Sequence, residues 1–151
     1  MTQPIFSIQI QSSEIRNKLI QLENLTQTLG SRRLVVGSNR DYMRKHQLGL
    51  EGLPKREVLG VSKKDEVIIL EIIDDAVNKP VEGSAISALK EIGEYMLLAT
   101  DERFKTETAP DGTKWTPNTP YTIAQKKALG RIQKVLQSTG IARATITYQI
   151  L

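Results

Sequence analysis

The chain contains no cysteine and a single histidine, His46, among its 151 residues. Without cysteine it has no thiol nucleophile, no iron–sulfur cluster, no disulfide framework and no cysteine-based zinc site. A single histidine excludes a metal centre with several histidine ligands, and a catalytic histidine base would have no second histidine beside it. Several classes of enzyme are therefore excluded, and we expect no cofactor and no metal.

Long hydrophobic runs are also missing. The longest strongly apolar stretch, residues 67–77, is interrupted by Glu71, Asp74 and Asp75, and it is far shorter than the roughly 20 residues that a membrane span needs. Residues 1–6 lack the basic and apolar regions of a secretory signal. We expect a soluble intracellular protein with no membrane partner. An apolar content of 39% and a charged content of 25% fit a single folded domain over residues 1–151.

Positive charge is concentrated in one part of the chain, residues 31–64, which we call the basic segment. It holds nine of the 21 Lys and Arg but only three of the 17 Asp and Glu, so it carries about +6 and the remainder about −2. Two interpretations stay open: contact with nucleic acid or an acidic neighbour, and an ordinary solvated loop surface. The cations are Arg32, Arg33, Arg40, Arg44, Lys45, Lys55, Arg56, Lys63 and Lys64.

Hydrophobic periodicity predicts an α+β protein, with a small antiparallel sheet packed against two to three main helices and with long loops. Alternating apolar residues predict the strands 5–11 and 145–150, and a short apolar run predicts the strand 33–37. Apolar stripes at helical spacing predict the helices that begin at residues 15 and 84. The expected strands are 5–11, 33–37 and 145–150, and the expected helices are 15–29, 66–77, 84 to about 104–108, 122–129 and 141–144.

Single residues refine these boundaries. Ser62, with Asp65 three residues later, has the spacing of a capping box and favours a helix over a strand for the Ile- and Val-rich run that follows. Ser84 is expected to cap the next helix, whose buried stripe would contain Ile86, Leu89, Ile92, Met96 and Ala99. Gly93 inside that stripe indicates close approach of another element. Four glycines and prolines (Gly49, Gly52, Pro54 and Gly60) predict mostly loop over residues 38–60.

Few residues suggest chemistry. Glu71 with Asp74 or Asp75 has helical i, i+3 or i+4 spacing and could hold a metal ion, but no third ligand is identifiable and a solvated acidic face is the favoured interpretation. His46 has no acid at a matching spacing, which favours a structural or surface role.

Three further side chains are candidates for contacts. Trp115 lies between prolines in a loop, where it would either anchor that loop to the core or contact another protein; the anchor is favoured. Arg103 and Arg143 could pair with acids on neighbouring subunits, although a surface role worth little energy is expected by default.

Three motifs between residues 91 and 150 together resemble the phage virion morphogenesis, or tail completion, family. They are a helix ending in an Arg-x-Phe-like pattern, a Pro-Asp-Gly-x-x-Trp-x-Pro loop and a Leu-x-x-Thr-Gly-x-x-Arg-x-Thr-Ile-x-Tyr strand entry. The matching residues are Arg103 and Phe104; Pro110, Asp111, Gly112, Trp115 and Pro117; and Leu136, Thr139, Gly140, Arg143, Thr145, Ile146 and Tyr148.

A second block, "LVVGSNRDYMRKHQLG" followed by "LPKREVLGVSKKDEVIILEII", is similar to the family's His-Gln segment and closing helix. The resemblance places this block after the Tyr strand, whereas here the segment 32–78 precedes the Trp loop. Either the order is rearranged or one block matches by coincidence. We favour rearrangement, and we predict that residues 33–37 and 145–150 pair as antiparallel strands in one sheet.

The resemblance implies a non-enzymatic structural protein of the virion neck or tail end, assembled in the host cytoplasm. It implies a ring of this chain, usually a hexamer, that completes the tail and supports head–tail joining, with tail tube and head–tail connector proteins as partners. The basic segment could then line the DNA channel, and loops 39–55 and 106–120 are the expected docking arms. The candidate interface residues are His46, Arg103, Asp111, Trp115, Arg143 and Tyr148.

Two other classes of function remain. A free nucleic-acid-binding protein using the basic segment would bind duplex DNA as a monomer, with strong salt dependence. A metal nuclease resting on Glu71, Asp74 and Asp75 would need Mg²⁺ and is ranked last, because no base is visible.

Overall fold

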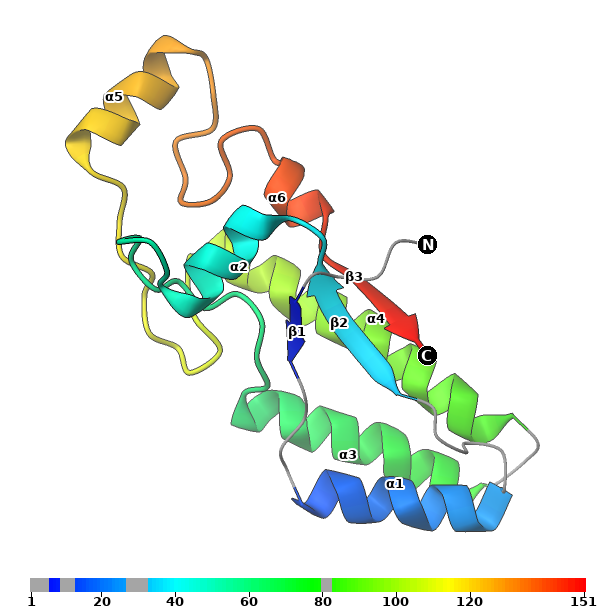
Figure 1. Ribbon diagram of the computed structural model, residues 1–151. Coiled ribbons are helices and arrows are strands. Elements are labelled where there is room, and N and C mark those ends of the chain that lie inside the picture. Colours follow the sequence, from blue (N-terminus) through cyan, green and yellow to red (C-terminus); the bar gives the residue numbers. More distant parts are fainter. Residues whose placement is uncertain (1–5, 9–12, 27–32, 80–82) are drawn as a thin grey trace.

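The structure is a computed structural model, and it describes residues 6–8, 13–26, 33–79 and 83–151. These residues form a small sheet and several helices, which confirms the α+β prediction (Figure 1). The elements are β1 (Phe6–Ile8), α1 (Ser13–Thr26), β2 (Leu34–Ser38), α2 (Asp41–Leu48), α3 (Lys63–Asn78), α4 (Ser84–Thr106), α5 (Pro120–Ala128), α6 (Ile141–Ala144) and β3 (Thr147–Ile150). The predicted positions 5, 9–11, 27–29 and Arg32 lie outside the described residues.

β2 is the central strand of an antiparallel sheet with the order β1-β2-β3. Its Val36 lies opposite Ile8 on one side and Tyr148 on the other. The β2–β3 ladder continues past both strands, because Arg33 and Leu151 exchange backbone hydrogen bonds of 2.9 and 2.8 Å. The predicted antiparallel pairing of residues 33–37 with residues 145–150 is thus confirmed.

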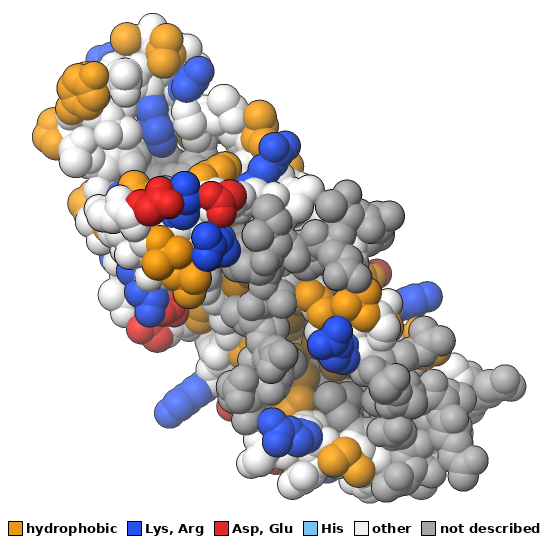
Figure 2. All heavy atoms as spheres, in the orientation of Figure 1, with side chains coloured by type: hydrophobic (Ala, Val, Ile, Leu, Met, Phe, Trp, Pro, Cys, Tyr) orange, Lys and Arg blue, Asp and Glu red, His pale blue; other side chains and the backbone are white. Residues whose placement is uncertain are grey.

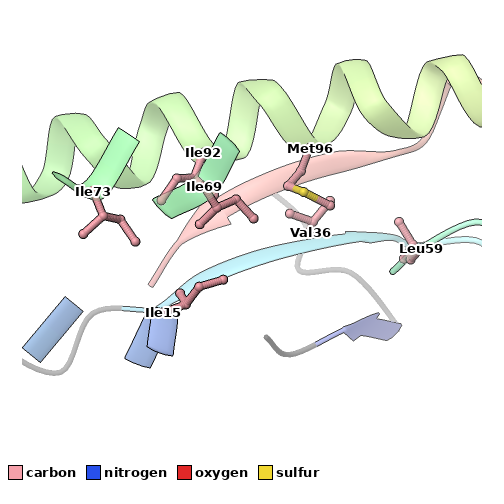
Figure 3. Close-up of a cluster of buried hydrophobic side chains, with 7 residues drawn as sticks. All are labelled: Ile15, Val36, Leu59, Ile69, Ile73, Ile92 and Met96. Carbon is pink, nitrogen blue, oxygen red and sulfur yellow. The ribbon is translucent and has the colours of Figure 1, made fainter. Parts of the chain in front are cut away.

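The main core lies between the sheet and the three long helices. Figure 1 shows the sheet across α4, with α1 and α3 together at one end of the molecule and α5 at the opposite end. Figure 3 shows the cluster of buried side chains that joins these layers, drawn from α1, β2, α3, α4 and the segment before α3. The cluster consists of Ile15, Val36, Leu59, Ile69, Ile73, Ile92 and Met96. None of the helices within the described ranges has the length and apolar character that crossing a bilayer requires.

The capping box at the start of α3 is formed as predicted. The Ser62 hydroxyl accepts the Asp65 N–H at 3.0 Å, and the Asp65 carboxylate accepts the Ser62 N–H at 2.8 Å. These bonds satisfy two of the N–H groups that a helix N-terminus leaves free. Ile69 and Ile73, four residues apart, are then buried on one face. The Ile- and Val-rich run is therefore a helix rather than a strand.

The start of α4 differs from the prediction. Gly83, with a φ of 81°, occupies the N-cap position, and Ser84 is the first helical residue. The Ser84 hydroxyl is buried without a hydrogen-bond partner among the described residues, so it caps nothing. The buried stripe is also shifted from the expected one, since Ile86 and Ala99 are only half-buried. Its members are Ala85, Ala88, Leu89, Ile92, Gly93, Met96, Thr100, Arg103 and Phe104.

The prediction of mostly loop over residues 38–60 was wrong at its start. Residues 41–48 form α2, which buries Met43 and Gln47 at the i, i+4 spacing of one helical face. Gly49, with a φ of 67°, ends the helix in the left-handed conformation, and its N–H bonds to the Lys45 carbonyl. The glycines and prolines that indicated a loop all lie beyond this helix.

Gly93 lets β3 approach α4 closely, as the sequence indicated. A Cβ at position 93 would lie 2.5 Å from Cδ2 of Tyr148, which is closer than real Cβ contacts allow. The ring of Tyr148 therefore packs directly on the α4 backbone, and the spacing between sheet and helix depends on the missing side chain.

We expect Gly93→Ala to lower the free energy of unfolding by about 1–3 kcal/mol, because overpacking outweighs the gain in helix propensity. Chemical denaturation followed by circular dichroism measures this loss. In a Tyr148→Ala background the same substitution should cost little, since the clashing ring is gone. Equal costs in both backgrounds would show that Tyr148 is not the obstacle.

Candidate functional site

Arg103 is the centre of a buried polar cluster that joins α4, α3 and the segment before α3. Only 6% of this arginine is exposed. Its Nη2 donates to the Asp65 carboxylate at 2.6 Å, and its Nη1 donates to the Val58 carbonyl at 3.1 Å. The Tyr95 hydroxyl donates to the other Asp65 oxygen at 2.7 Å. Burial and this carboxylate raise the pKa of Tyr95 to about 12.

This placement corrects the expectation for Arg103. A surface role was expected by default, with pairing to a neighbouring subunit as the alternative, but the side chain is buried in its own chain. The carboxylate of Asp65 has two roles, since it closes the capping box of α3 and pairs with Arg103. The cluster therefore fixes the end of α4 against the start of α3.

Trp115 holds its loop against the core, as the favoured interpretation predicted. It is 5% exposed, and its indole N–H donates to the Glu57 carbonyl at 2.8 Å. Its ring meets Phe104 edge-on, with centroids 5.5 Å apart. Phe104 and Trp115 belong to a second buried cluster, together with Met43, Val58, Val135 and Ala142.

Arg56 was assigned to the basic patch but is 7% exposed. Its Nε donates to the Thr116 carbonyl at 2.8 Å and its Nη2 to the Pro117 carbonyl at 3.3 Å. Arg56 thus supports the loop that follows Trp115, and it is not available as a surface cation.

The side-chain amide of Gln47 is a structural contact that sequence reasoning did not identify. Its oxygen accepts the N–H groups of Val58 and Leu59 at 2.7 and 2.9 Å, and its nitrogen donates to the Leu59 carbonyl at 2.7 Å. One amide therefore satisfies three backbone groups of a segment that has no strand partner. The available signal was the His-Gln motif together with the helical spacing from Met43.

His46 and Arg56 border a hollow of about 530 Å³ between α2 and the segment 117–140. Lys126 also borders it, whereas none of the described Asp or Glu residues does. The ring Nδ1 of His46 lies 3.4 Å from Nη1 of Arg56, and the Tyr42 ring meets the imidazole edge-on. Burial and the Arg56 charge lower the pKa of His46 below its ordinary 6.5.

The remaining candidate interface residues have partners within the chain. Arg143 pairs with Asp101 on α4, and Tyr148 covers Gly93. Asp111 is exposed at the tip of a turn, where its carboxylate accepts the Thr113 N–H at 2.9 Å. This bond lowers the pKa of Asp111. Their roles at an interface between subunits stay predictions.

The basic segment does not form one continuous cationic surface in the described residues. Acids of the same segment neutralise several of its cations: Arg44 and Lys45 pair with Asp41, and Lys55 pairs with Glu57. Lys45 also reaches Glu51 at 2.8 Å. Arg33, Arg40, Lys63 and Lys64 are exposed. The pairing acids are already included in the count of about +6, so pairing does not lower the net charge, but it leaves fewer cations of the segment without a carboxylate partner.

The three acids considered as metal ligands point to different places. Asp74 pairs with Lys18 of α1 at 2.6 Å, whereas Glu71 and Asp75 line a groove between α3 and α4. Among the described residues, no group of three or more His, Cys, Asp or Glu is arranged to hold a metal ion.

The structure is an α+β protein in which side chains of the motifs, such as Arg103 and Trp115, bond to backbone carbonyls of the loops and hold them against the helices. Comparison with family models gives a match to the phage virion morphogenesis family over residues 8–78 and 79–151, and the chain belongs to this family. The break between the two matched segments falls at the end of the segment 32–78 that the sequence placed out of family order. Searches of curated proteins and of solved structures find no match.

We expect Arg103→Met to lower the free energy of unfolding by about 3–5 kcal/mol, because it leaves the Asp65 carboxylate buried without its counter-charge. The double variant Asp65→Asn with Arg103→Met should cost clearly less than the sum of the two single substitutions. Urea denaturation of the four proteins measures the coupling. Additive costs would show that the pair does not act as a unit.

His46 provides a pH test, because it is the only histidine. A pKa below 6.5 in the folded state means that the unfolded chain binds more protons as the pH falls through 6.5, so stability should decrease below that pH. NMR titration of the single imidazole should give a pKa under 6.5, and Arg56→Gln should raise it. A value above 6.5 would contradict the described environment.

Proposed function

We propose that this chain is a non-enzymatic structural protein of the phage neck or tail end. Copies of it form a closed ring, hexameric in our proposal, that completes the tail and supports its joining to the DNA-filled head. The proposed partners are the tail tube and the head–tail connector proteins. Packaged DNA would pass through the ring.

Membership of the virion morphogenesis family, over nearly the whole chain, is the observation that carries this proposal. The contacts of three side chains agree with this proposal. Arg103, Trp115 and Gln47 each bind backbone carbonyls or amides of loops. Side chains used in this way give loops a fixed shape, which a subunit needs in order to present the same surface in every copy of a symmetric assembly.

The runner-up, a free nucleic-acid-binding protein, has less support. Its cations should be free to neutralise phosphates, but Arg56 is buried and Arg44, Lys45 and Lys55 are paired with carboxylates. We therefore expect weak binding of duplex DNA by the isolated chain.

Deleting the gene from its phage tests the proposal. Electron microscopy of the lysate should show DNA-filled heads and unattached tails instead of complete virions. Adding the purified chain to the lysate should restore infectious particles, whereas adding buffer should not. A normal yield of infectious virions without the gene would contradict the proposal.

A further inference from the structure

Residues 118–134 form an arm that extends from the body of the molecule. The arm contains α5. The structure describes every residue of α5, and none of them is buried. Figure 1 shows α5 at one end, apart from the other helices. Four large apolar side chains of the arm are exposed, with exposed fractions of 75% for Tyr121, 39% for Ile123, 59% for Leu129 and 49% for Ile132. Apolar groups gathered on a protruding element mark a contact with another molecule.

Hydrogen bonds at its base give the arm a defined shape. Asn118 donates to the Gln133 carbonyl at 3.0 Å, which joins the two ends of the arm. Lys126 donates to the Lys134 carbonyl at 2.9 Å, and Lys134 donates to the Lys105 carbonyl of α4 at 2.8 Å. An element ordered in advance loses less entropy when it binds.

The arm carries only positive charge. It contains Lys126, Lys127, Arg131 and Lys134, and the chain has no Asp or Glu after Asp111. In the view of Figure 2, the lobe around α5 shows hydrophobic and basic side chains and no acidic ones. A partner for this surface has to offer carboxylates around an apolar centre.

A groove between α3 and α4 offers this combination. It encloses about 390 Å³, and four carboxylates line it: Glu71, Asp75, Glu91 and Glu94. None of the four has an ion-pair partner within the part of the chain that the structure describes.

Apolar side chains also line the groove. Ile68 and Leu98 line it, and Leu98 is 70% exposed. A second hollow of about 490 Å³ lies further along α4 and shares Glu94 and Leu98 with the groove. Leu98 is therefore an exposed apolar side chain beside four carboxylates that have no ion-pair partner among the described residues.

We propose that the arm of one copy docks in the α3–α4 groove of the next copy, with Ile123 and its apolar neighbours against Leu98 and with Lys127 and Arg131 facing Glu91 and Glu94. This inference rests on the proposed function and names the contact that builds the ring. Figure 1 shows α5 at the opposite end of the molecule from α3, which forms one wall of the groove, so the arm is remote from the groove of its own chain. The contact is head-to-tail, and such contacts close into rings when the rotation per subunit allows it.

The absence of native cysteine makes a direct test simple, because only introduced thiols can be cross-linked. Ile123→Cys chains are mixed with Leu98→Cys chains and treated with a short flexible bis-maleimide. Heterodimers should exceed both homodimers. The matched control is Ser87→Cys, which is exposed on α4 outside the groove; its yield with Ile123→Cys should stay at the level of random collision. Equal yields for Leu98→Cys and Ser87→Cys would overturn the proposal.

Charge reversal tests the complementarity. Lys127→Glu with Arg131→Glu, or Glu91→Lys with Glu94→Lys, should each lower the heterodimer yield by about tenfold, because like charges then face each other. Reversing both sides together should restore it. Lys63→Glu with Lys64→Glu reverses the same number of exposed charges elsewhere and should change nothing. If arm reversal instead leaves the yield unchanged but abolishes binding of duplex DNA, the arm is a nucleic-acid contact and the proposal is wrong.

A double variant, Ile123→Cys with Leu98→Cys, separates this contact from the proposed ring. Cross-linking should give a ladder of oligomers that stops at one closed species. A closed dimer, or a ladder without a limit, supports the contact and contradicts the ring. Rings seen by electron microscopy without preferential cross-linking contradict the contact and leave the ring intact.

Discussion

The pairing of β2 with β3 is the constraint on which the structure depends. β2 lies in the first segment that matches the family and β3 in the second, so each segment contributes to one sheet. The pairing brings Tyr148 onto Gly93 and sets the distance from the sheet to α4. The buried contact of Asp65 with Arg103 joins the same two segments elsewhere. Neither segment has a closed core without the other.

This mutual dependence bears on the altered block order that we favour from the sequence. Strands that pair through space need no particular order along the chain, provided that their connections are long enough. α3 leads to α4 across the point where the two family matches meet, and the two helices pack on each other there. An altered order can therefore retain the contacts that the resemblance implies.

Patterns that act locally could be predicted from the sequence, and contacts of buried polar groups could not. Alternation identified β3, a short apolar run identified β2, and serine–aspartate spacing identified the cap of α3. The sequence alone indicated a free cation at Arg56 and, by default, a surface role for Arg103, whereas both are buried with backbone carbonyls as acceptors. The glycines and proline from Gly49 onwards indicated a loop, so α2 was not predicted. Its only sequence signal is the i, i+4 spacing of Met43 and Gln47. Ser84 looked like a cap because serine favours that position, but Gly83 provides the left-handed turn.

The subunit therefore has a body joined by buried apolar clusters and a buried ion pair, with a basic, partly apolar arm at one end and an acidic, partly apolar groove between α3 and α4. We propose that such subunits join arm to groove in a closed ring at the end of the phage tail. Cryo-electron microscopy of the intact virion tests this proposal most directly. We expect a ring of this chain at the junction of head and tail, with α5 of each subunit against α3 and α4 of the next. A virion that lacks the chain, or that holds it with the groove empty and the arm elsewhere, would show that the proposal is wrong.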